Sequence, residues 1–306
     1  MNYEKDRVLT SIVIPSARKS QVNRTISCLA LQTLDPKHYE ILVVTPGIES
    51  FDPHPMISVR ILSTAQLFPP GKMRNIGAKG SRGEYIFFID DDCLPPPEWL
   101  EKTLLTFHKN QGIGAIGCRV VSAHRGFWNR CADFALFGTY QYDRYYYRDI
   151  GSAAIAVRRK AYEDSGGFNE ALYASEDWDF NFRLKKNGWK TAFIPDVEVL
   201  HNHGRGSVQG ILKQAFNSGA YSGLTAQMAH IDQLSFLARL SVKMGSPWFY
   251  WLFIFPYALA IAGLQIIEQK KSDKRFWLFI PMIFIARCCF QFGVWITLIN
   301  DAKSKK

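Results

Sequence analysis

YIFFIDDD, residues 85–92, decides the fold of this chain. Its first five residues are aromatic or β-branched, which is typical of a strand buried on both faces of a parallel sheet. Three aspartates follow at the carboxyl end, where open α/β sheets bind ligands. Their mutual repulsion favours a bound cation with oxygen ligands, Mg²⁺ or Mn²⁺, and a solvated acidic turn is the alternative. In an extended backbone Asp90 and Asp92 face one way and Asp91 the other.

The residues on either side alternate between strand and helix patterns. Short apolar runs predict strands at 11–15, 40–44, 58–62, 112–121, 153–157, 191–194 and 197–200. Apolar residues at helical spacing predict helices at 20–30, 72–80, 97–110 and 176–187. Residues 122–150 match neither pattern. This alternation predicts an α/β fold with a mainly parallel sheet flanked by helices.

Length and composition exclude several classes of protein. The 306 residues leave room for two domains. A hydrophobic content of 47% with 21% charged residues excludes disordered, collagen-like and coiled-coil chains. The six cysteines lack the spacing of a zinc site or a disulfide framework and suit a reducing compartment. The first residues lack the pattern of a signal peptide, so we expect the amino-terminal part in the cytoplasm.

Two apolar segments stand near the carboxyl end. Residues 247–267 carry no charge, and residues 276–299 carry one, Arg287. Because about 20 apolar residues cross a bilayer, the two segments and the link at 268–275 predict a membrane hairpin. The prolines in both segments and the central arginine also suit helices that lie in the membrane interface.

The positive charge gathers around these segments. Residues 238–306 contain ten Lys and Arg and three Asp and Glu, which is +7 of the net charge of +10. Basic residues beside apolar segments indicate anionic lipid as a partner and not nucleic acid. Apolar residues at helical spacing in 208–244 predict amphipathic helices. We therefore expect an α/β domain at 1–206, interfacial helices at 207–246, and a membrane hairpin with a basic tail at 247–306.

Two further motifs carry candidate chemistry. Glu176 and Asp177 start a predicted helix after a glycine turn, where Asp177 can project into a cleft and accept a proton. Acids in a first helical turn are also common partners of the helix dipole. His201 and His203 flank an asparagine after a short strand, which suits a metal ligand or a phosphate donor, and simple packing is the alternative.

The order of these motifs over about residues 8–206 resembles the family 2 glycosyltransferases, inverting enzymes of GT-A fold that use nucleotide-sugar donors. The motifs lie at 11–19, 71–77, 83–85 before the aspartates, 151–159, 166–170, and 176–177 with 183–184. The resemblance implies that Asp90 and Asp92 hold a Mn or Mg ion on the donor diphosphate, that His201 reaches this metal or a phosphate, and that Asp177 is the general base. The implied substrate-binding residues are Pro15, Ser16, Lys72, Arg74, Asn75, Asp90, Asp91 and Glu176. An ion pair between Arg74 and a nearby carboxylate is the alternative for that residue.

The donor base and the acceptor are less determined. Thr45 and Pro46 stand where the family usually has an acidic residue that binds the nucleotide base, so UDP is expected but GDP and dTDP stay open. Tyrosines and arginines in 140–148 suit the sugar and phosphate of an acceptor, or a loop that folds onto its own domain. With the apolar hairpin, they indicate a saccharide or lipid-linked acceptor at the cytoplasmic face of the inner membrane.

The sequence therefore predicts a membrane-associated inverting glycosyltransferase of cell-envelope or surface-polysaccharide synthesis. It would move a sugar to a hydroxyl or phosphate of its acceptor. A catalytically silent membrane scaffold of the same fold is one alternative. A nucleotidyltransferase is the other, although residues 15–19 lack the Gly- and Arg-rich loop that such enzymes have after their first strand.

Overall fold

The computed structural model describes residues 8–17, 19–47, 57–138, 145, 149–228, 252, 254–269 and 274–304. The chain divides into two compact units. The sheet unit comprises Met1–Ala123 and Arg144–His203, and the helical unit comprises His124–Asp143 and Gly204–Lys306. The tyrosine-rich stretch, apart from Tyr145, lies outside the described residues.

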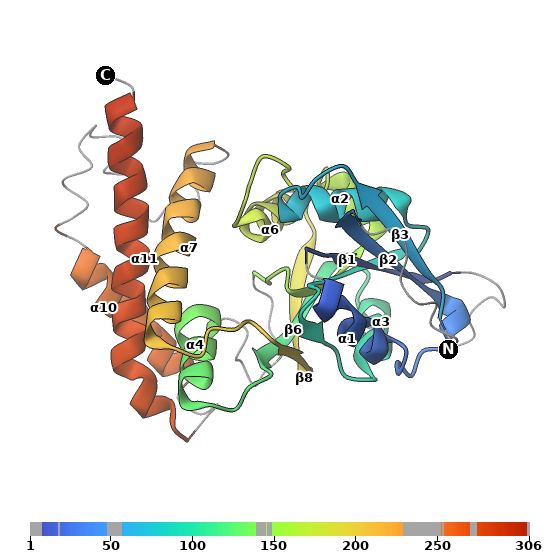
Figure 1. Ribbon diagram of the computed structural model, residues 1–306, viewed down its shortest axis with the longest axis horizontal. Helices are drawn as coiled ribbons and strands as arrows, with labels where there is room; N and C mark the ends of the chain where they lie inside the picture. Colours follow the sequence, from blue (N-terminus) through green and yellow to red (C-terminus); the bar gives the residue numbers. More distant parts are fainter. Residues whose placement is uncertain are drawn as a thin grey trace. The chain divides into compact units, whose positions relative to one another are not determined.

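The sheet unit is built on one eight-stranded sheet of order β3-β2-β1-β4-β7-β6-β8-β5 (Figure 1). Its strands are β1 (Thr10–Pro15), β2 (Tyr39–Pro46), β3 (Val59–Thr64), β4 (Tyr85–Ile89), β5 (Cys93–Leu94), β6 (Ile113–Ser122), β7 (Ala154–Arg158) and β8 (Lys190–His201). All five residues of β4 are buried, as its apolar sequence predicts for a strand covered on both faces.

The sheet is mixed. β1, β2, β3 and β4 pair in parallel, and so do β6 and β8. β7 runs antiparallel between β4 and β6, and β5 runs antiparallel to β8. Because β7 runs opposite to β4, it starts where β4 ends, and the Asp90 amide donates to the Ala153 carbonyl at 3.0 Å. This arrangement brings the loop before β7 to the three aspartates and confirms the predicted α/β fold.

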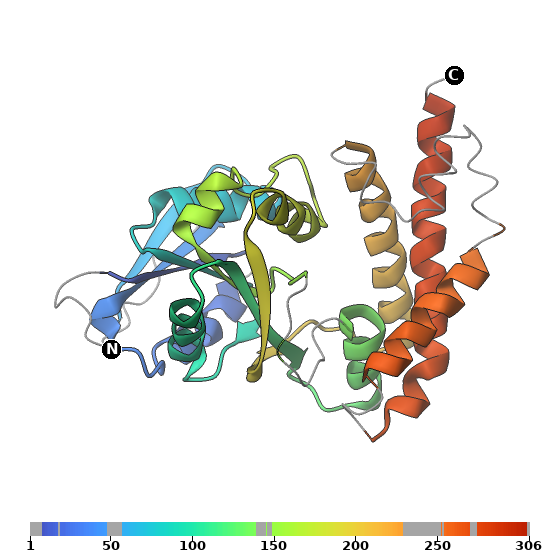
Figure 2. The ribbon, with the colours of Figure 1, turned by 180° about the vertical axis from the view of Figure 1, so that it is seen from behind.

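Helices cover both faces of the sheet. They are α1 (Lys19–Leu29), α2 (Pro70–Gly80), α3 (Trp99–Lys109), α5 (Arg159–Asp164) and α6 (Glu176–Lys186), with a short 3₁₀ helix at Pro36–His38. Figures 1 and 2 show α2 on one face and α1 with α3 on the other. α2 lies very close to the sheet at Gly77, where a Cβ atom would stand 2.2 Å from Val13 Cγ1. Only glycine allows this approach without displacing a neighbour.

Two predictions of secondary structure need correction. The strands predicted at 191–194 and 197–200 form one strand, β8, because its pairing with β6 skips residues 195–197 in an irregularity and then continues. Residues 122–150, which match no pattern, contain the helix α4 (Phe127–Phe137).

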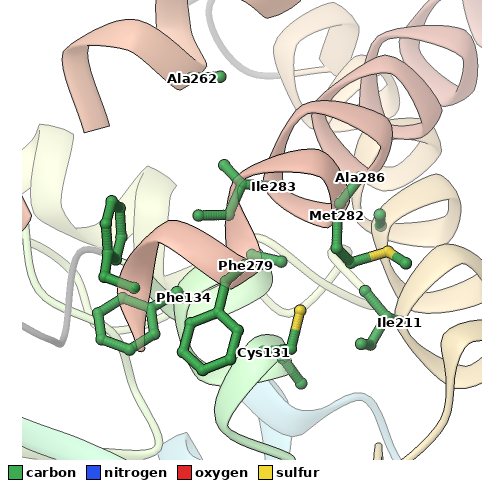
Figure 3. Packing of buried hydrophobic residues seen from close by; sticks show 12 residues of the cluster. Cys131, Phe134, Ile211, Ala262, Phe279, Met282, Ile283 and Ala286 are labelled. Atoms are coloured by element: carbon green, nitrogen blue, oxygen red, sulfur yellow. The ribbon is translucent and has the colours of Figure 1, made fainter. Parts of the chain in front are cut away.

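The helical unit consists of α4, α7 (Val208–Met228), α10 (Ile254–Gln269) and α11 (Phe276–Ser304). Its core contains Phe134 of α4, Ile211 of α7, Ala262 of α10 and Phe279 of α11 (Figure 3). Among the described residues one helix, over Phe276–Asn300, is long and apolar enough to cross a membrane, and Ile254–Ile267 is a shorter apolar helix. The rest of the first predicted hairpin segment and of the predicted interfacial helices lies outside the described residues.

Candidate active site

A cleft of about 510 Å³ opens at the carboxyl ends of β1 and β4. Six of the predicted substrate-binding residues line it, namely Pro15, Ser16, Arg74, Asp90, Asp91 and Glu176. Its other lining residues are Ala17, Leu67, Phe68, Pro69, Pro70, Met73, Ser152, Tyr173 and Ala174. The cleft thus combines an apolar wall with one arginine and three carboxylates, a composition that suits a ligand with both apolar and charged parts.

Asp91 joins the ends of β1 and β4. Its Oδ2 accepts hydrogen bonds from the Ser16 hydroxyl at 2.9 Å and from the Ala17 amide at 3.1 Å. Its carbonyl oxygen accepts from the Thr25 hydroxyl at 2.9 Å. The side chain is buried. These bonds fix the backbone at the mouth of the cleft, which Asp91 lines together with Asp90. The alternation predicted for an extended backbone does not apply here, because β4 ends at Ile89 and Asp91 and Asp92 lie in a turn.

Arg74 lies at the centre of the cleft and ties two elements together. Its Nη1 donates to Glu176 Oε1 at 2.6 Å, and its Nη2 donates to Asp90 Oδ1 at 2.8 Å. The guanidinium is only 2% exposed and stacks 5.5 Å from the centroid of the Phe168 ring. The ion pair that the sequence left as an alternative for Arg74 is therefore present. Burial raises the pKa of Asp90, while the charges of Arg74 and His201 oppose this shift.

Asp177 sits at the start of α6 with a carboxylate that can accept a proton. Its Oδ1 accepts from the Trp178 amide at 2.8 Å, and its Oδ2 accepts from the Ser152 amide at 3.3 Å. Burial and the neighbouring charge of Glu176 raise the pKa of Asp177 to about 7. Ser175 immediately precedes Glu176 and Asp177. Its φ of 61° lies in the left-handed region that residues other than glycine rarely adopt. Such strain is common where a backbone must aim a functional group.

Ser152 connects these groups, and the sequence analysis missed it. Besides its amide bond to Asp177, its hydroxyl donates to Glu176 Oε1 at 3.2 Å and its carbonyl accepts from Arg74 Nη2 at 3.4 Å. Its only signal in the sequence is its place in the 151–159 motif, immediately before the strand that pairs with β4.

Asp92, Cys93 and His201 form a second group beside the cleft. His201 Nε2 lies 3.3 Å from Asp92 Oδ1. Cys93 pairs with His201 in the β5–β8 ladder, and one ligand atom from each of the three residues lies within 4.8 Å of the others. A carboxylate and an imidazole fit a Mn²⁺ ion, so Asp92 and His201 would hold it, while Cys93 adds a soft ligand that the sequence did not indicate.

Lys72 and Asn75 contact the protein and do not line the cleft. Asn75 Nδ2 donates to the Phe168 carbonyl at 2.8 Å and to Glu170 Oε1 at 3.1 Å, and its Oδ1 accepts from the Tyr162 hydroxyl at 2.6 Å. Lys72 Nζ lies 4.1 Å above the Phe68 ring. In this structure both side chains support the walls around the site.

Comparisons with known proteins give the family context. Residues 2–218 match the family model described as Glycosyltransferase like family 2. A pre-mycofactocin glycosyltransferase of Mycobacterium tuberculosis is 27% identical over 173 residues, 52% of this chain and 35% of that protein. An uncharacterized glycosyltransferase of Haemophilus influenzae is 25% identical over 186 residues, 58% of this chain and 62% of that protein. The chain therefore matches less than two thirds of the length of either relative.

One solved structure shares the fold over most of its length. The mannosyltransferase PcManGT from Pyrobaculum calidifontis, in complex with GDP-Man and Mn²⁺, aligns with a TM-score of 0.55 at 16% identity. The alignment covers 90% of this chain and 85% of that chain.

Proposed function

The chain belongs to glycosyltransferase-like family 2, and from this premise we propose that it is a metal-dependent inverting glycosyltransferase. It would move a sugar from a nucleotide diphosphate sugar to a hydroxyl or phosphate of a saccharide or lipid-linked acceptor, in cell-envelope or surface-polysaccharide synthesis. The observation that carries the proposal is a network of hydrogen bonds at the cleft. Arg74 joins Asp90 to Glu176, and Ser152 joins Glu176 to Asp177, which lies next to the lining residue Glu176.

The donor would occupy the cleft at the ends of β1 and β4. Leu67, Phe68 and Pro69 offer an apolar wall to a nucleoside, and the backbone beside Ser16 is held rigid by Asp91. PcManGT has been solved with GDP-Man, which supports a nucleotide-sugar donor for the shared fold. Thr45, where the family usually has an acid, leaves the choice between a UDP and a GDP sugar to experiment.

Asp92 and His201 would hold the divalent ion, Mn or Mg, and Asp90 would lie beside it. When bound, this ion would stabilise the negative charge that develops on the departing diphosphate. Arg74 keeps Asp90 in place through its 2.8 Å hydrogen bond and holds Glu176 with its other nitrogen. The arginine would thus position the residues around the donor and would not itself need to contact the nucleotide.

Asp177 would act as the general base. Its carboxylate takes the proton of the acceptor hydroxyl while that oxygen attacks the anomeric carbon from the face opposite the diphosphate. The new carbon–oxygen bond forms, the bond to the diphosphate oxygen breaks, and the nucleoside diphosphate leaves, so the anomeric configuration inverts. A pKa near 7 suits this role because about half of the group is ionised at neutral pH and the carboxylate is basic enough to take the proton.

The cellular setting is proposed from the helical unit and the cysteines. The apolar α11 supports association with the inner membrane, where a lipid-linked acceptor would be met. All six cysteines are free thiols, which supports a cytoplasmic position of the sheet unit.

Release of nucleoside diphosphate tests the activity. Detergent-purified protein is incubated with Mn²⁺ and a panel of nucleotide sugars, and the wild type is compared with Asp92→Ala. Release from one donor, abolished by the substitution, is the expected result. Release of sugar 1-phosphate, the group that leaves when the nucleotidyl part of the donor is transferred, would instead indicate a nucleotidyltransferase. Donor binding without turnover would indicate a silent scaffold.

A further inference from the structure

The helical unit buries several polar side chains beside its apolar core and leaves large apolar side chains exposed. On α10, Gln265 is 6% exposed, whereas its neighbours Leu264 and Ile267 are 58% and 69% exposed. On α11, Gln291 and Thr297 are buried, whereas Trp277 and Leu278 are more than half exposed. A surface helix of a protein in water typically turns its polar side chains outward and its apolar stripe to the core. Exposed apolar surface of this extent marks a surface that meets an apolar partner.

The one charge within Phe276–Asn300, the apolar part of α11, is also paired inside the helical unit. Arg287 donates from Nη2 to Gln265 Oε1 at 2.9 Å and from Nε to the same oxygen at 3.3 Å. Gln265 Nε2 donates in turn to the carbonyl oxygen of Phe134. This relay runs from α11 through α10 to α4, within the helical unit. Charged groups within membrane segments typically turn to the bundle interior and pair with polar groups or backbone carbonyls in this way.

α7 and α11 approach each other through small residues. A Cβ atom on Gly219 would lie 1.9 Å from the carbonyl oxygen of Phe290, and one on Gly293 would lie 2.2 Å from that of Phe216. The Thr297 hydroxyl donates to the Ala220 carbonyl at 3.1 Å. Glycine contacts and hydroxyl-to-backbone bonds are the features that hold helices together where water does not drive association.

We propose that α10 and α11 lie in the hydrocarbon of a lipid bilayer, with the exposed apolar residues of both helices against the acyl chains. These residues, the lipid face, are Phe255, Leu259, Leu264, Ile267, Trp277, Leu278, Ile285 and Ile296. The Arg287–Gln265–Phe134 relay keeps the arginine out of lipid, so α10 and α11 enter as a pair docked on α4.

Length and charge favour a bilayer over a second protein chain. The 25 residues of the apolar segment Phe276–Asn300 extend about 37 Å, enough for a hydrocarbon layer of about 30 Å. Lys274 and Arg275 stand exposed just before this segment, where they can meet anionic headgroups. The inference deepens the membrane association in the proposed function and does not depend on the transfer chemistry.

Vesicle flotation tests the lipid face. Full-length protein is mixed with vesicles of phosphatidylethanolamine and phosphatidylglycerol as detergent is removed. Leu259→Lys with Ile267→Lys should lower the vesicle-bound fraction at least tenfold. The matched control is Leu31→Lys with Leu105→Lys, because these leucines are also exposed but lie in the sheet unit, and it should float like the wild type.

Two results would overturn the lipid face. One is equal flotation of both double variants. The other is a wild-type dimer that the α10 double variant converts to monomer without loss of flotation, which would make the face a contact between copies. Nucleoside diphosphate release, measured in detergent on the same samples, shows separately whether the transfer proposal holds.

A second pair of variants tests the relay. Gln265→Leu removes the Arg287 partner in lipid and should lower by severalfold the fraction of protein that resists extraction by alkaline carbonate. Adding Arg287→Met removes the charge as well and should restore this fraction. A single variant that resists extraction like the wild type, or a double variant that is no better than the single, would contradict the relay.

Discussion

Arg74 Nη1 lies 2.6 Å from Glu176 Oε1 across 102 residues of chain, with both side chains less than a tenth exposed. The same guanidinium reaches Asp90, so one side chain joins the start of α6 to the end of β4. Separating this buried pair would leave its charges uncompensated, which costs far more free energy than breaking a surface pair. The pair therefore holds the start of α6, where Asp177 lies, in place relative to Asp90.

Arg74→Met should therefore destabilise the fold strongly. The buried Glu176 and the partly exposed Asp90 lose their partner, which costs about 3 to 5 kcal/mol. Urea denaturation measures the loss. The matched control is Lys160→Met, which breaks the exposed Lys160–Asp164 pair and should cost less than about 1 kcal/mol. Similar losses for the two variants would show that the Arg74 pairs do not organise the site.

The rate of transfer should depend on the ionisation of Asp177. Since burial and Glu176 raise its pKa to about 7, the protonated form dominates at lower pH and cannot accept a proton. We expect kcat/KM to be constant above this pH and to fall about tenfold for each pH unit below it. Asp164→Asn, at an exposed acid whose pKa is lowered by Lys160 and Trp189, should leave the profile unchanged. A flat profile from pH 5 to 8 would contradict the role of Asp177.

Glu40 should make the fold sensitive to acid. Burial alone would raise its pKa, but hydrogen bonds from Ser11 and the Arg82 amide, with the Arg82 charge, lower it overall. A carboxyl whose pKa is lower in the folded state stabilises the fold at any pH above its pKa in the unfolded chain. This contribution is lost as pH falls through the lowered pKa of the folded state. Glu40→Gln should cost about 1 to 3 kcal/mol at pH 7 and flatten the decrease in Tm between pH 5 and pH 3. A wild-type Tm that does not decrease over this range would contradict the prediction.

Asp92, Cys93 and His201 should contribute differently to the affinity for Mn²⁺. Asp92→Ala and His201→Ala should each weaken binding at least about tenfold, because each removes a ligand of a type that Mn²⁺ accepts. Cys93→Ala should leave Mn²⁺ affinity within about twofold, since a thiol is a poor ligand for this ion. Calorimetry measures all three variants. Loss of affinity only in Cys93→Ala would indicate a different metal at this position.

The sequence predicts those parts of the site that follow from local pattern. The apolar residues 85–89 can only be buried, so the aspartates after them had to lie at the carboxyl edge of the sheet. The acids that start α6 follow from the helix signal at 176–187.

The parts that depend on tertiary pairing could not be predicted in this way. No local pattern connects Arg74 with Glu176, and the antiparallel entry of β7, which brings Ser152 to Asp177, depends on the path of residues 122–150. The two short apolar runs at 191–194 and 197–200 predicted separate strands, but an irregularity in the pairing with β6 joins them into β8. The buried Arg287–Gln265 bond of the helical unit was equally hidden, since hydropathy reports composition and not which side of a helix faces its neighbours.

Sugar transfer by Asp177→Asn, measured beside donor binding, tests the central claim most directly. The variant keeps the size of the side chain and removes the proton acceptor. We predict that its kcat falls about 10²- to 10⁴-fold while the calorimetric Kd for the donor with Mn²⁺ stays within about threefold of the wild type. Transfer by the variant at the wild-type rate would contradict the assignment of Asp177 as the base and the mechanism built on it.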